Sequence, residues 1–215
     1  MYHQVVDLFP RPLIRTKIEV KNDIISFFYN TIKTQINKKS NRTSPTSIVK
    51  GLVHYHNDEN IFNIYEELNE LEKLILNSAN FTYRKILNHK NDLYITNAWF
   101  NECAVGAGQF MHNHCNSVLS GTLYLNTDEN TNIQFLSPYG YSDTVNNLVD
   151  CADMKEKNEF GYLYHYTHCT VNVERGDCLF WPSYMKHGYD ANMTPNRLSL
   201  SFNMMPKNFN HTYKI

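Results

Sequence analysis

The part of the chain from Leu93 onward consists of short runs of β-branched and aromatic residues, which turn residues separate. Runs of this kind predict β-strands. Many short strands that follow a helical region predict an all-β barrel or jelly roll with a helical layer formed by the N-terminal residues. The runs cover residues 93–100, 109–114, 119–126, 133–136, 170–173, 178–181 and 197–204.

Two amphipathic helices are predicted ahead of these strands. The first begins at a cap on Asn22 or Asp23 and ends near residue 37, with its apolar residues on one face. The second extends from about residue 60 into the eighties, with a break near 77–80. Its apolar residues are spaced by four, three and four positions, which fits the helical period. They are Ile64, Leu68, Leu71 and Ile75.

Length and composition indicate one globular domain over residues 1–215. A chain of 215 residues is long enough for one core and short for two. Residues 1–90 are expected to form an extended arm and a helical support layer, and residues 93–205 the jelly-roll core. The polar stretch 139–159 is rich in Gly, Asn and Asp, and we expect it to be an insertion that acts as a lid.

Charge and cysteine content argue against several classes of protein. The net charge is −1, so a dedicated nucleic-acid surface is not expected, and no apolar run is long enough to cross a membrane. The five cysteines are odd in number and include no Cys-x-x-Cys, which indicates free thiols in a cytoplasmic protein. A homodimer is the default expectation for the assembly.

Three segments of the β-rich part carry residues suited to chemistry. His112 and His114 lie two apart in a predicted strand, so both side chains would project to one face and could bind one metal ion. His187 follows a Gly turn and a Phe-Trp-Pro strand. Arg197 and Ser199 alternate with apolar residues in a strand that looks buried, and burying polar groups is costly unless they have a partner or a ligand.

The order of these residues resembles the motif of the 2-oxoglutarate/Fe(II) dioxygenase superfamily. That motif is His-x-Asp or His-x-Glu, then a distal His, then Arg-x-Ser; this chain has His112-x-His114, His187 and, ten residues later, Arg197-x-Ser199. The segments 112–125 and 197–203 also resemble small oxygenases of marine phages and bacteria, which often have His-x-His-Pro followed by Leu-Ser-Gly-x-Tyr-Tyr. The resemblance covers roughly residues 93–205.

The resemblance implies an oxygenase that binds Fe(II) and 2-oxoglutarate and uses O₂ to hydroxylate an unidentified substrate. Its core would be a double-stranded β-helix, and its location the cytoplasm, or that of the host if a phage encodes it. The catalytic residues would be His112 and His187, which bind iron as neutral imidazoles, and Arg197, which binds the far carboxylate of the oxoacid. Ser199 would donate a further hydrogen bond to that carboxylate, and Tyr124 is either another donor to it or an aromatic residue of the core.

The third ligand position departs from the superfamily pattern, because His114 stands where the motif has a carboxylate. Either three histidines bind the metal, which we favour, or His114 lies outside the coordination shell. In that case water or a distant acid, such as Asp190 or Asp143, completes the shell. Three histidines would also suit zinc, manganese or copper.

Two other functions remain open from the sequence. Cupin-like jelly rolls, which bind a metal with another ligand or chemistry, also use His-x-His with a distal His. The Arg197-x-Ser199 pair distinguishes the two classes, because the oxoacid requires it and a cupin does not. A phage protein that keeps the fold without metal is disfavoured, because His112 and His187 are both present.

Histidines and tryptophans outside the motif are interpreted as structural. His165 and His168 would have poor chelating geometry away from a helix. Trp99 and Trp181 are interpreted as core residues that could border the pocket. The histidines in polar stretches are interpreted as surface residues, and they are His54, His56, His89 and His211.

Overall fold

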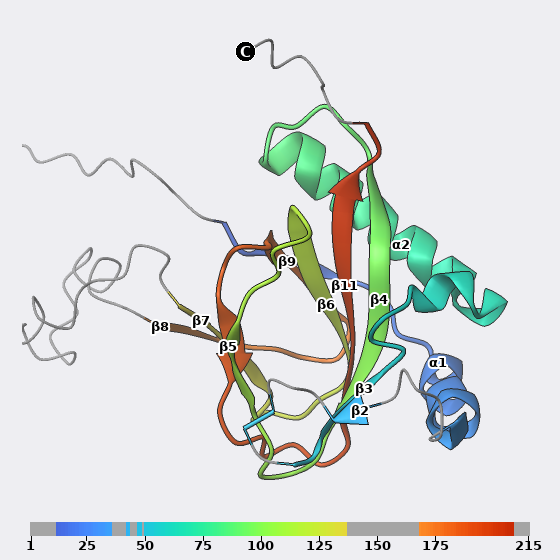
Figure 1. Cartoon of the computed structure of the whole chain (residues 1–215), viewed down its shortest axis with the longest axis vertical. Coiled ribbons are helices and arrows are strands. Elements are labelled where there is room, and N and C mark those ends of the chain that lie inside the picture. The colour runs from blue at the N-terminus through green and yellow to red at the C-terminus, as the bar shows by residue number, and fades with distance from the viewer. Residues whose placement is uncertain (1–11, 36–41, 44–46, 49, 137–167, 209–215) are drawn as a thin grey trace, which may run out of the picture.

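Two antiparallel β-sheets and a helical layer make up the described part of the chain in the computed structural model (Figure 1). The strands of the large sheet lie in the order β1-β9-β6-β11-β4-β3-β2, and those of the small sheet in the order β5-β10-β7-β8. The described residues are 12–35, 42–43, 47–48, 50–136 and 168–208. The predicted lid, together with Asp143, His165 and His211, lies outside them.

The strands agree closely with the predicted runs, and the mainly β fold with N-terminal helices is confirmed. The largest difference is in β4, which ends at Cys103 and not at Phe100. Strands β2, β3 and β10 were not predicted, and β1 lies in the segment expected to form an extended arm. The bounds are β1 Ile14–Lys17, β2 Arg42–Thr43, β3 Leu52–Tyr55, β4 Leu93–Cys103, β5 Gln109–His112, β6 Leu119–Asn126, β7 Asn132–Leu136, β8 His168–Asn172, β9 Asp177–Pro182, β10 His187–Tyr189 and β11 Arg197–Pro206.

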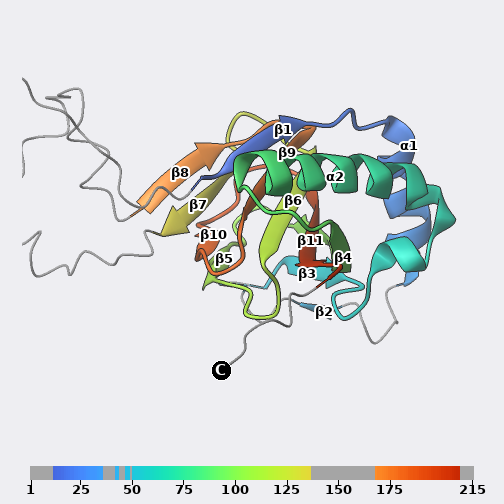
Figure 2. The same ribbon diagram turned by 90° about the horizontal axis from the view of Figure 1, so that it is seen from above.

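The helical layer covers the outer face of the large sheet (Figure 2). Helix α1 (Asn22–Phe27) continues as a π turn to Ile32, and its N-cap is Lys21, so the predicted cap was wrong by one or two residues. Helix α2 (Asn69–Phe81) continues as a π turn to Ile86. No helix among the described residues is long and apolar enough to cross a membrane.

The predicted break near 77–80 in the second helical segment was also wrong, because the chain is interrupted earlier, at Tyr65. The backbone of Tyr65 is extended, with φ −125° and ψ 111°. Its hydroxyl donates to Gln35 Oε1 at 3.0 Å, and its ring packs edge-on against Phe27 at 5.4 Å between centroids. These contacts to the first helical segment hold Tyr65 out of a helical conformation, so tertiary packing overrides the local helical period.

Strand β11 separates a hydrophobic core from a polar space between the sheets. Its even-numbered residues from Leu198 to Met204 are buried in the main core with the helices. Successive side chains of a strand point to opposite faces, so the odd-numbered residues face the small sheet. These residues are Arg197, Ser199, Ser201 and Asn203, all of which line a cavity.

Two histidines interpreted as surface residues are buried, which corrects that prediction. His54 and His56 are 6% and 1% exposed, because β3 pairs with β4 and brings this segment onto the large sheet. The Nδ1 of His56 lies 2.7 Å from Glu59 Oε2, which compensates its burial. His89 is exposed, as predicted, and His168 is exposed as well.

Candidate metal centre

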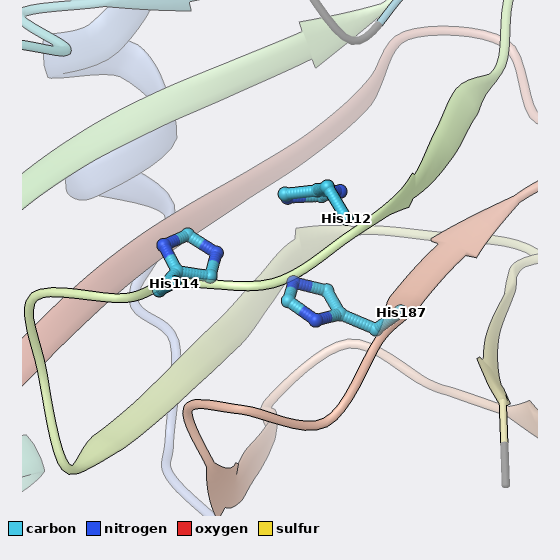
Figure 3. Close-up of side chains that lie close together, drawn as sticks. All are labelled: His112, His114 and His187. Atoms are coloured by element: carbon cyan, nitrogen blue, oxygen red, sulfur yellow. The ribbon is translucent and has the colours of Figure 1, made fainter. Parts of the chain in front are cut away.

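Three histidine rings face one another in the space between the sheets (Figure 3). His112 ends β5 and His187 begins β10, and the two are paired across the strand ladder. One ring nitrogen of each, and one of His114, all lie within 4.8 Å of one another, a spacing that one metal ion can bridge. The structure thus brings together the three histidines that the sequence proposed as metal ligands.

Close packing of β5 against β10 positions the first two rings. A Cβ added to Gly188 would lie 2.5 Å from the carbonyl oxygen of Gln109, so only glycine allows this approach next to His187. His114 lies two residues beyond the end of β5, and its main-chain N–H donates to the main-chain oxygen of Ser183 at 2.9 Å. The prediction that strand alternation aligns His112 with His114 was therefore wrong in its cause, because a loop places the second ring.

Main-chain carbonyls fix the proton positions on two of the rings. His112 Nδ1 lies 2.9 Å from Phe110 O, and His187 Nδ1 lies 3.0 Å from Met185 O. A carbonyl only accepts, so Nδ1 must carry the proton and Nε2 keeps a lone pair, which at His112 faces Gln109 Nε2 at 3.5 Å. This is the tautomer that a histidine needs in order to bind a metal through Nε2.

The rings are also held in the uncharged state that binds metal. Burial lowers the pKa of His112 and takes that of His187 well below its ordinary value. Burial, with repulsion from His112 and His54, lowers the pKa of His114 to about 4. At neutral pH all three rings therefore offer lone pairs without first losing a proton.

Arg197 is a buried cation in the same cavity. It is 4% exposed, and its guanidinium lies 3.7 Å from the ring centroid of Tyr189. Its Nη2 donates to Asn132 O at 2.8 Å. Among the described residues no carboxylate lies within ion-pair distance of it, although a buried charge is normally paired. This arrangement suits the binding of an anionic ligand.

A cavity joins the histidines and Arg197. Every site residue proposed from the sequence lines it, including Ser199 and Tyr124. Trp181 lines it too, and its buried Nε1 has no hydrogen-bond partner among the described residues, so it remains available to a ligand. The cavity therefore suits a metal ion bound together with a carboxylic acid. It offers histidine nitrogens to the metal, and the Arg197 cation and the Trp181 N–H to the acid.

Some residues of the cavity were missed from the sequence, and one proposed acid lies elsewhere. Tyr189 and Asn203 could have been found from the sequence, because alternate residues of a strand point to the same face. Tyr189 lies two positions after His187, and Asn203 lies six positions after Arg197. Asn101 on β4 could not have been found in this way. Asp190 is exposed, accepts from Gln134 Nε2 at 3.0 Å and is not part of the histidine cluster.

Residues 97–203, about half of the chain, match the model of a family described as "Putative 2OG-Fe(II) oxygenase". The chain belongs to the 2-oxoglutarate/Fe(II) oxygenases. Their cofactors, Fe(II) and 2-oxoglutarate, are the ones predicted from the resemblance. Membership favours the oxygenase over the cupin-like alternative. No curated protein matches the chain in sequence.

The fold is similar to that of several solved oxygenases. The alpha-ketoglutarate-dependent epimerase SnoN from nogalamycin biosynthesis is 14% identical, with a TM-score of 0.58 over 91% of this chain and 79% of that one. HygX from Streptomyces hygroscopicus, with nickel and 2-oxoglutarate bound, is 11% identical, with a TM-score of 0.53 over 93% and 84%. A Pseudomonas putida prolyl-4-hydroxylase is 12% identical, with a TM-score of 0.52 over 92% and 94%. These likenesses confirm the double-stranded β-helix fold.

Proposed function

We propose that His112, His114 and His187 bind Fe(II), and that Arg197 binds the distal carboxylate of 2-oxoglutarate, in an enzyme that hydroxylates a C–H bond of a second substrate. One observation carries the assignment: the buried guanidinium of Arg197 has no carboxylate partner among the described residues and lines the same cavity as the histidines. A dicarboxylic oxoacid supplies the missing anion at Arg197 and two donor oxygens at the metal.

When bound, the metal and the oxoacid supply O₂ activation: 2-oxoglutarate loses CO₂ to give succinate, which takes one oxygen atom, and the other becomes the hydroxyl of the product. The protein binds and orients the reactants. The planar guanidinium of Arg197 matches a carboxylate bidentately, and Ser199 lies two residues further along the same face of β11. Burial raises the pKa of Tyr124 to about 12, so its hydroxyl stays protonated and can donate.

The charges of the proposed site also favour the oxoacid. Three neutral imidazoles leave the metal with its full positive charge, and Arg197 adds another. For a doubly charged anion bound between the metal and Arg197, the free-energy cost of desolvation is largely offset, because each of its ends meets a positive charge. This supports His114 as the third ligand in a site without a carboxylate.

The orientation of Asn203 decides whether His114 can be that ligand. The Nδ2 of Asn203 lies 3.1 Å from His114 Nδ1, and the Oδ1 of Asn203 accepts from Ser120 Oγ at 2.8 Å. His114 can bind metal through Nε2 only if Asn203 turns its oxygen toward Nδ1 and its nitrogen toward Ser120. The Ser120 hydroxyl can accept that bond, because it can donate to Ser183 Oγ at 2.8 Å.

Replacing Asn203 therefore tests the third ligand. Asn203→Leu should weaken Fe(II) binding by about 10- to 100-fold, the usual effect of losing a partner that orients a ligand. Asn203→Asp should keep the affinity of the unmodified protein or exceed it, because a carboxylate only accepts and holds the proton on Nδ1. Anaerobic Fe(II) titration against a competing chelator measures both, with circular dichroism to verify folding. Equal affinity in folded Asn203→Leu would remove His114 from the proposed shell.

The function as a whole is tested by anaerobic titration of the protein with Fe(II) and 2-oxoglutarate. A weak visible metal-to-ligand charge-transfer band should appear when the oxoacid chelates the iron. A bound metal without this band, at saturating oxoacid, would favour the cupin-like chemistry instead. The same titration with succinate is the control, since succinate lacks the keto oxygen that chelation needs.

The location and the assembly of the protein are part of the proposal. Cys103, Cys115, Cys169 and Cys178 are free thiols, which supports a reducing compartment such as the cytoplasm, of a host cell if a phage encodes the chain. We also propose a homodimer, which sedimentation analysis can test.

A further inference from the structure

A second cavity, of about 310 Å³, lies beside the histidines. Arg197, Ser199 and Tyr124 line only the first cavity, so a molecule in the second can approach the metal ligands without displacing an oxoacid held by Arg197. Its size is within the range of small-molecule sites. The wall shared by the two cavities consists of Trp99, His112, His114 and Asn203.

Carboxamides dominate the lining of this second cavity, which we name the amide pocket. Among the described residues that line it there is no Lys, no Arg and no aliphatic side chain, and its one carboxylate belongs to Asp58. An anionic ligand would find no cationic side chain among these described residues, and an aliphatic ligand no aliphatic wall. Beyond the shared wall, the pocket is lined by His54, Asn57, Asp58, Asn97, Asn113 and Asn116.

Several of these amides still have hydrogen-bonding capacity within the described part of the chain. The oxygen of Asn97 accepts from Thr96 Oγ1 at 3.0 Å, and that of Asn57 lies 3.2 Å from His54 Nδ1, so both amide nitrogens remain available. The side chain of Asn116 makes no hydrogen bond to a described residue. Amides both donate and accept, and hydroxyl groups match them because they do the same.

Trp99 is the largest side chain that lines the amide pocket, and it is 6% exposed. Its Nε1 donates to Asn101 Oδ1 at 2.8 Å, and its ring stacks on His114 with 6.0 Å between centroids and 30° between planes. The indole is therefore fixed beside a proposed metal ligand. A flat ligand with C–H groups on one face and hydroxyls around its edge can pack on the indole while the amides bind the hydroxyls.

We propose that the amide pocket binds the substrate of the oxygenase, and that this substrate is a neutral polyhydroxylated molecule of the saccharide class. The inference rests on the proposed function, because a metal at the three histidines is what makes a C–H bond in this pocket reactive. The ring C–H bonds of a sugar packed on Trp99 are the ones that lie next to His114.

Saturation-transfer difference NMR on protein loaded with Zn(II) and 2-oxoglutarate tests the substrate class. The probes are methyl glycosides of common hexoses and pentoses, neutral disaccharides, and charged counterparts: glucuronate, glucose 6-phosphate and glucosamine. At least one neutral sugar should bind, with its anionic counterpart at least tenfold weaker. Binding of methyl glycosides and of disaccharides alone distinguishes a single sugar from a sugar unit within a larger molecule.

Variants place the binding in the amide pocket. Asn97→Leu and Asn116→Leu should each lower the affinity for the bound sugar at least tenfold and leave 2-oxoglutarate binding unchanged. Asn172→Leu, at an exposed position of β8, is the matched control and should bind as the unmodified protein does. With Fe(II), the same sugar should increase succinate formation from 2-oxoglutarate.

An intact Fe(II)–oxoacid charge-transfer band with no neutral sugar bound would overturn the inference and leave the proposed function intact. Anionic probes that bind as tightly as neutral ones would do the same. Loss of the charge-transfer band in the unmodified protein would instead contradict the proposed function itself. Sugar binding that Asn97→Leu and Asn116→Leu leave unchanged would place it outside the amide pocket and overturn the inference.

Discussion

Replacing His187 by alanine is expected to yield a folded protein that no longer retains Fe(II), with metal affinity reduced by at least about 100-fold. Loss of a residue that merely orients a metal ligand costs 10- to 100-fold, and His187 is proposed to bind directly. The residue is 5% exposed and its ring lies 4.4 Å from that of His112, so water cannot readily replace it with the same geometry. Metal analysis after anaerobic loading and desalting measures the effect.

The matched control is His168→Ala, at an exposed position of β8 in the same small sheet. It should retain metal as the unmodified protein does. His187→Gln keeps more of the side-chain volume than alanine does. If this variant also fails to retain iron, the loss does not come from a packing defect alone. If the His187 and His168 variants retained equal amounts of iron, the proposed centre would be wrong.

Arg197→Leu should raise the dissociation constant for 2-oxoglutarate by at least about 100-fold and leave Fe(II) affinity nearly unchanged. Removing one partner of a buried charge pair typically costs about 2–5 kcal/mol, and about 3 kcal/mol corresponds to that change in affinity. Arg197→Lys should give an intermediate value, because it keeps the charge and loses the planar fork. Anaerobic titration of the charge-transfer band against the oxoacid measures all three proteins.

The thermal stability of the Arg197→Leu variant should not decrease, although its affinity for the oxoacid does. Without ligand, the variant should unfold at the same temperature as the unmodified protein or higher, because it no longer buries a cation without a carboxylate partner among the described residues. A purely structural arginine would show the reverse, a lower unfolding temperature and unaltered oxoacid binding. Arg175→Leu is the control: that guanidinium is exposed and donates to Val20 O and Asn22 Oδ1.

The β-rich core was predictable because local patterns encode it. Strand β6 was predicted to the residue, since its run of apolar and β-branched residues has turn residues at both ends. Strand β10 was not, because it has only three residues, one of them Gly188, and its pairing with β5 and β7 comes from distant parts of the chain. Strand β3 was missed because its pairing with β4 also depends on a distant part of the chain. The burial of His54 was missed with it.

The site was predictable where a motif defined it and not where three-dimensional packing did. The order of His112, His187 and Arg197 was enough to propose a common cavity, and the structure brings them to one. The stacking of Tyr189 on Arg197 is visible only once β10 and β11 face each other across the two sheets. The place of Asn203 beside His114 depends in the same way on a loop that approaches β11.

The hydrogen bonds that fix the histidine tautomers differ in how easily a substitution can remove them. His112 and His187 each use the carbonyl two residues earlier in the chain, and no side-chain substitution can delete a carbonyl group. His114 contacts a side chain, Asn203, which a single codon change can replace. Natural variation in this centre should therefore gather at positions 114 and 203, and lineages that change one should change the other.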